Sequence, residues 1–146
     1  MFGESTRLMF KKRRVRALIF DIFAEAGFVR SDRPFPHNMS YLCHYVYETG
    51  VDKWWRIISR QPASIEAYAC EIIKFTMEGC SPEKYLAAME KEGKYKPIDI
   101  VDKDLLKEIK ELNDLSTAQF GPTTGEYEGD LEATHGALLV AMNRYR

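Results

Sequence analysis

The chain has 146 residues, of which 45% are hydrophobic, 29% charged and 12% aromatic, with a formal net charge of −1. These values are typical of one soluble globular domain that folds without a structural metal or disulfide. The three cysteines are an odd number without CxxC spacing, which favours a reducing compartment over a disulfide scaffold. No apolar run approaches the roughly 18 residues of a membrane span, and no signal peptide is evident. We therefore expect a cytoplasmic protein, or a nuclear one in a eukaryotic cell.

The first predicted element is a long helix. Apolar residues recur at helical spacing from Val15 to Ala26, which defines one face of a helix. Ser5 or Thr6 is suited to cap its start, and Gly27 to end it.

A connection and two helices follow in the next third of the chain. Prolines in 30–37 predict an irregular connection, because proline lacks an amide donor and favours extended backbone before it. A helix is predicted over 38–48, with a stop at Gly50. Asp52 is then the expected cap of a short separate helix that carries two tryptophans.

The middle of the chain contains clear start and stop signals. A helix is predicted over 63–78, with Gly79 as its stop. Ser81, followed by proline and glutamate, predicts the start of another helix, which Gly93 closes. Its expected inward side chains are Tyr85, Leu86 and Met89.

Two more helices are predicted in the last third. One covers 103–115 with Asp102 as its cap, and the other covers 130–144. Between them, 116–129 is polar and contains glycines and a proline, so it is predicted to be a long loop. The last helix carries an apolar stripe of Leu131, His135, Leu138, Met142 and Tyr145.

These elements predict an all-α fold. No alternating strand pattern is present, so we expect a compact bundle of six to seven short and medium helices. Residues 1–146 are expected to form a single domain. Residues 1–14 are an alternative candidate for a flexible basic arm.

Charge is distributed very unevenly along the chain. Residues 1–34 hold eight basic and four acidic side chains, a net charge of +4. Residues 98–134 hold three basic and ten acidic side chains, a net charge of −7. The two ends of the chain are therefore electrically opposite.

A basic cluster lies in the first predicted helix and consists of Lys11, Lys12, Arg13, Arg14 and Arg16. Helical spacing predicts that Lys12, Arg13 and Arg16 project away from the apolar stripe, with Phe20 at the edge of this basic surface. Such a patch is suited to nucleic-acid phosphates, because each contact releases counterions. An acidic protein partner, pairing with the acidic half of the chain, and simple solvation are the alternatives. Membrane docking is not predicted, because the core needs the apolar stripe.

A second candidate site is formed by Arg30, Arg33 and His37. An arginine followed a few residues later by a histidine resembles the signature of HEPN ribonucleases, which are small helical proteins. The resemblance implies that such a pair would position and protonate the scissile phosphodiester of RNA. An imidazole that titrates near neutrality is suited to this chemistry. This chain departs from the pattern in having two prolines within the spacing.

No metal or cofactor is predicted. The candidate ligands are His37, Cys43, His44, Cys70, Cys80 and His135. They lack the paired spacing of zinc sites, and Cys43 and Cys70 are better interpreted as small buried side chains. The carboxylates of 126–132 lack the pattern of an EF-hand loop. Motifs of nucleotide-binding loops, serine hydrolases and zinc proteases are also missing from the sequence.

Large aromatic side chains are dense between positions 41 and 75: Tyr41, Tyr45, Tyr47, Trp54, Trp55, Tyr68 and Phe75. One interpretation is that they fill the core. The other is that a tryptophan is exposed, in which case it would line a partner groove or stack on a base.

The pattern as a whole predicts a non-catalytic binding or assembly subunit. We expect it to dock on nucleic-acid backbone, RNA or DNA, or on a larger protein complex, through the basic helix at 11–16. Arg30 and Arg33 would extend this surface. The alternative is a small HEPN-like ribonuclease that uses the Arg and His pair.

Overall fold

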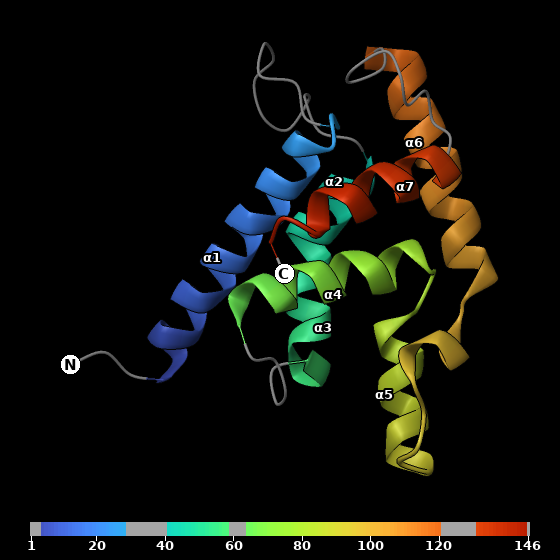
Figure 1. Cartoon of the computed structure of the whole chain (residues 1–146). Helices are drawn as coiled ribbons and strands as arrows, with labels where there is room; N and C mark the ends of the chain where they lie inside the picture. The colour runs from blue at the N-terminus through green and yellow to red at the C-terminus, as the bar shows by residue number, and fades with distance from the viewer. Residues whose placement is uncertain (1–3, 29–40, 59–63, 121–130, 146) are drawn as a thin grey trace.

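A computed structural model describes residues 4–28, 41–58, 64–120 and 131–145 (Figure 1). Its helices are α1 (Glu4–Glu25), α2 (Tyr41–Tyr45), the π-helical segment η1 (Val46–Gly50), α3 (Val51–Ile58), α4 (Ile65–Met77), α5 (Pro82–Lys91), the 3₁₀ turn η2 (Pro97–Ile100), α6 (Lys103–Phe120) and α7 (Leu131–Met142). The described residues contain no strand, only an isolated antiparallel bridge between Cys80 and Val101. The predicted all-α fold is confirmed.

The helix α1 forms as its periodicity predicts and packs against α4 and α7. The stripe from Val15 to Ala26 lies in the core. Gly27 ends the helix with φ of +91°, and the N–H of Phe28 donates to the carbonyl of Phe23 at 2.8 Å. Residues 4–14 form the first half of this helix.

The predicted break between the second and third helices is wrong. The chain stays helical from α2 through η1 into α3, and Asp52 caps nothing. Gly50 lies inside this helical run, where an added Cβ would come within 3.4 Å of Cγ2 of Ile72. Glycine here permits α4 to approach closely rather than ending a helix.

The boundaries of α4 and α5 follow their sequence signals. Ser81 Oγ accepts a hydrogen bond from the backbone N–H of Lys84 at 3.4 Å, as expected for an N-cap. Gly79 and Gly93 both adopt positive φ just after a helix, at +75° and +71°. Met89, expected to face inward, is exposed, whereas Tyr85 lies against Trp54 of α3 with ring centroids 6.1 Å apart.

The helix α6 is longer than predicted. Asp102 caps its start, where Oδ1 accepts a hydrogen bond from the N–H of Leu105 at 3.3 Å. The helix then continues to Phe120, so the first five residues of the expected 116–129 loop are helical. This stretch contains no glycine or proline before Gly121 and Pro122, so nothing stops the helix earlier. The rest of that loop lies outside the described residues.

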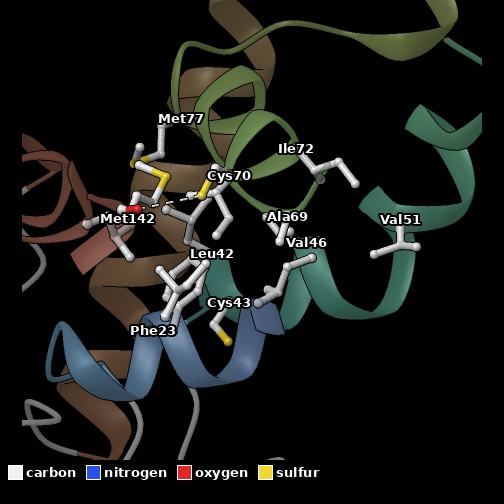
Figure 2. Packing of buried hydrophobic residues seen from close by; sticks show 14 of the residues in the cluster. Phe23, Leu42, Cys43, Val46, Val51, Ala69, Cys70, Ile72, Met77 and Met142 are labelled. Carbon is white, nitrogen blue, oxygen red and sulfur yellow. Dashed lines mark hydrogen bonds between the residues drawn. The ribbon is translucent and has the colours of Figure 1, made fainter. Parts of the chain in front are cut away.

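The core sits where α1, η1, α4 and α7 meet (Figure 2). Its side chains are almost all aliphatic, aromatic or sulfur-containing. Cys70 Sγ donates to the backbone carbonyl of Met142 at 3.9 Å, which joins α4 to the last turn of α7. Leu138 and Met142 of the predicted last stripe are buried, whereas His135 and Tyr145 are half-buried.

Six of the seven aromatic side chains between positions 41 and 75 lie in the core or against it: Tyr41, Tyr45, Trp54, Trp55, Tyr68 and Phe75. Trp54 and Trp55 are only 1% and 8% exposed. Trp55 stacks on Tyr68 with ring centroids 5.0 Å apart, and Trp54 lies against Phe75 at 5.1 Å. The interpretation that a tryptophan lines a partner groove or a base-stacking surface is therefore wrong.

Candidate nucleic-acid interface

The basic side chains of α1 fall into two groups that the sequence does not distinguish. The inner group consists of Lys12 and Arg16, which are partly covered by α3 and η1. The outer group consists of Arg7, Lys11, Arg13 and Arg14, which are exposed.

The inner group is held by one carboxylate. Lys12 Nζ lies 2.9 Å from Oδ1 of Asp52, and Arg16 Nη2 lies 2.8 Å from its Oδ2. Arg16 Nε also donates to the backbone carbonyl of Tyr47 at 2.8 Å. The ammonium group of Lys12 stands 5.8 Å from the ring centroid of Trp55, within cation–π distance.

These contacts correct the predicted surface. Lys12 and Arg16 do not project freely from the domain, since their side chains are only 22% and 21% exposed. The helix α3 covers the face of α1 that lies beside the apolar stripe. Asp52 on α3 pairs with both Lys12 and Arg16. Arg16 also joins α1 to the π-helical segment through Tyr47. The inner group is therefore structural.

The ionisation of Asp52 suits this role. Partial burial by itself raises the pKa of the carboxyl group, but the hydrogen bond from Lys12 and the positive charge of Arg16 outweigh it. The net effect lowers the pKa of Asp52 below its ordinary value, so the carboxylate is charged at neutral pH.

Among the residues that the structure describes, the outer group has no such counter-charge. No ion pair links Arg7, Lys11, Arg13 or Arg14 to any residue that the structure describes. Arg7, Lys11 and Arg14 follow one another at spacings of four and three residues, so they line one side of the helix. Like charges at these spacings repel one another and destabilise the helix by about 0.2–0.5 kcal/mol per pair.

Phe20 is half-buried and packs against the core. It follows Arg16 by four residues on the helix, so its place at the edge of the basic surface stays a prediction. The aromatic side chain that does lie among the outer cations is Phe10, which is 48% exposed. Its position in the sequence, between Arg7 and the basic run that begins at Lys11, is a signal for this placement that the apolar stripe alone does not give.

Internal neutralisation by the acidic half of the chain is not seen among the described residues. Lys107 pairs with Glu111 within α6, and Lys84 of α5 pairs with Asp102 at the start of α6. Glu25, at the C-terminal end of α1, pairs with Arg144 of α7. Figure 1 shows α1 and α6 on opposite sides of the body.

The second candidate site cannot be placed in the fold. Arg30, Arg33 and His37 lie outside the described residues. Both the ribonuclease hypothesis and the extension of the basic surface by the two arginines therefore stay predictions.

A hollow of about 310 Å³ lies between the end of α1 and α7. Its lining is mostly small and apolar, and its two ionisable side chains, Glu25 and Arg144, pair with each other. This lining contains no Ser, Thr, Cys, His or Lys side chain, and its one carboxylate is paired with Arg144.

The cysteines are buried thiols. Burial and the nearby charge of Glu78 raise the pKa of Cys80 to about 11, and burial raises the pKa of Cys43 as well. Both thiols are therefore protonated at neutral pH and poorly suited to act as nucleophiles. Within the described ranges, no three His, Cys, Asp or Glu side chains gather closely enough to hold a metal ion. No helix there is long and apolar enough to cross a membrane.

Comparisons of this chain with protein-family models, with curated proteins and with solved structures find no match.

Proposed function

We propose that this protein is a binding or assembly subunit that docks on nucleic-acid phosphates through the outer cations of α1. The observation that supports this is the contrast between two sets of similarly spaced charges on one helix. Lys12 and Arg16 share the carboxylate of Asp52, whereas Arg7, Lys11 and Arg14 have no described partner. A polyanion would relieve the repulsion within the outer group.

The identity of the cations favours phosphate. Three of the four outer side chains are arginines, whose planar guanidinium groups bind phosphate oxygens through two parallel hydrogen bonds. The helical rise from Arg7 to Arg14 is about 10 Å. That length equals roughly three base-pair rises of about 3.4 Å along the axis of a duplex. The outer cations therefore cover a length comparable to a few nucleotides.

The position of the charges is not explained by helix stability. Cations stabilise the C-terminal end of a helix and are disfavoured in its first turn by the helix dipole. Arg7 lies in the first turn of α1, and Lys11 follows four residues later. Their placement costs stability within the chain, which is consistent with a role in binding.

The test is anisotropy of labelled single-stranded RNA and duplex DNA titrated with the protein at about 50 and 200 mM salt. We expect binding that weakens by at least tenfold over this range and is lost when Arg7, Lys11 and Arg14 are all changed to Gln. The matched control changes Lys91, Lys94 and Lys96 to Gln, which removes the same charge from exposed positions outside α1. The control is expected to bind like wild type.

Two results would overturn the proposal. One is the absence of binding to either nucleic acid at low salt while an acidic peptide binds, which would favour a protein partner. The other is an equal loss in the two triple variants, which would show that only net charge matters.

A further inference from the structure

The first half of α1 exposes apolar side chains as well as cations. Leu8, Met9 and Phe10 are 36%, 47% and 48% exposed. Leu8 is seven residues before Val15 and therefore continues the face that enters the core, yet it is exposed. Figure 1 shows this end of α1 reaching away from the other helices. The first turns of α1 therefore extend beyond the part of the domain against which its later turns pack.

Phe10 lies among arginines on this projecting end. Arg7 precedes it by three residues, and Arg13 and Arg14 follow it by three and four. Side chains three or four positions apart are neighbours on a helix surface, so the exposed ring is flanked by guanidinium groups toward both ends of the helix.

The exposed apolar side chains do not form the face that a membrane surface requires. Consecutive helical residues point about 100° apart, so Leu8, Met9 and Phe10 point in three different directions. An interfacial helix needs its apolar side chains gathered on one side, with cations on the other. Here the ring and the cations share one side instead.

An aromatic ring beside cations is suited to single-stranded nucleic acid. In a strand without a partner, base faces are open and stack on aromatic side chains, while the backbone follows a positively charged surface. In a duplex the base faces are covered by neighbouring base pairs, and a ring on a helix meets only base edges and phosphates.

We infer that the projecting half of α1 binds single-stranded nucleic acid, with Phe10 stacked on a base and Arg7, Arg13 and Arg14 on the flanking phosphates. This inference rests on the proposed function, because it takes the same helix to be the phosphate-binding surface. It adds the class of ligand and the residue that recognises it.

The experiment compares two strands that carry the same phosphates. One is a uridine strand of about 12 nucleotides, and the other is an abasic strand of equal length. Wild-type protein is expected to bind the uridine strand roughly 5- to 100-fold more tightly, the range typical of one stacked base. Phe10→Leu is expected to abolish this preference without changing affinity for the abasic strand, and Phe10→Tyr to keep it.

The outcomes separate the inference from the proposed function. Equal binding of both strands by wild type would overturn the stacking inference and leave phosphate binding in place. Tighter binding of a duplex than of the uridine strand would do the same. No binding of any strand, with or without binding to vesicles of anionic phospholipid, would overturn both proposals. Circular dichroism of Phe10→Leu checks that its helices are intact, and loss of the preference in Phe10→Tyr as well would also contradict stacking.

Discussion

Arg16 on α1 and Asp52 on α3, 36 residues apart in sequence, form an ion pair of 2.8 Å. The same guanidinium group donates to the carbonyl of Tyr47 in the π-helical segment, so one side chain ties α1 to two parts of the continuous helical run. This relationship separates the structural cations of α1 from those that face solvent.

Replacement of Arg16 by Met is expected to lower the free energy of unfolding by about 1–2 kcal/mol, because it removes two hydrogen bonds to charged or partly buried acceptors. The aliphatic stem is kept, so the loss reports on the polar contacts. Arg13→Met is the matched control and is expected to change stability by less than about 0.5 kcal/mol, since Arg13 is exposed. Urea unfolding of both variants measures the difference. Equal effects would show that Arg16 is no more structural than Arg13.

Asp52 is expected to make stability depend on pH in the acidic range. Its pKa is lowered in the folded state by Lys12 and Arg16, against the opposing effect of partial burial. The contribution to stability is therefore complete above the unfolded pKa near 4 and disappears as pH falls through the lower folded value. Wild type is expected to be more stable than Asp52→Asn at pH 6, and the gap to close as pH falls through the lowered pKa of the folded state. Thermal unfolding across this range tests it, and a constant gap would contradict the ionic role of Asp52.

Gly79 is expected to tolerate alanine less well than Gly93. Both have positive φ, which costs a residue with a side chain about 1–2 kcal/mol. At Gly79 the added Cβ would also lie 3.1 Å from Cβ of Leu106 and 3.2 Å from the carbonyl of Asp102, whereas at Gly93 its nearest neighbour is 3.8 Å away. Gly79→Ala should therefore lose at least about 1 kcal/mol more than Gly93→Ala in chemical denaturation. A smaller loss at position 79 would show that the α4–α6 junction is loosely packed.

Gly136→Ala is expected to stabilise the protein. Gly136 is exposed inside α7, and an added Cβ would meet no atom within 4 Å. Alanine in a helix interior is about 0.5–1 kcal/mol more favourable than glycine. A rise in the midpoint of thermal unfolding is the expected result. A fall would contradict the open surroundings of this position and show that the added Cβ is not accommodated.

Local chemistry made part of this fold predictable. The stripe ending at Ala26 has the period of a helix, and the cap formed by Asp102 follows from a short side chain that accepts backbone hydrogen bonds. The sequence wrongly predicts a helix stop at Gly50, because glycine serves two purposes, ending helices and permitting close packing. The choice between them depends on Ile72, which is distant in sequence.

The candidate site was predictable only in outline. Composition places the basic cluster on one helix, and periodicity gives the angle of each side chain around its axis. Neither composition nor periodicity shows on which side of the apolar stripe another helix packs. That depends on α3 bringing Asp52 to Lys12 and Arg16, so the sequence did not separate these two from Arg13 and Arg14.

We expect the outer cations of α1 to contact phosphates and the inner ones, Lys12 and Arg16, not to do so. The most direct measurement is the slope of the logarithm of affinity for a single strand against the logarithm of salt concentration, in wild type and two single variants. Arg14→Gln is expected to reduce the magnitude of the slope by about 0.7, the value for one lost phosphate contact, and Lys12→Gln to leave it unchanged. An unchanged slope in Arg14→Gln, or a reduced slope in Lys12→Gln, would contradict this division of the helix.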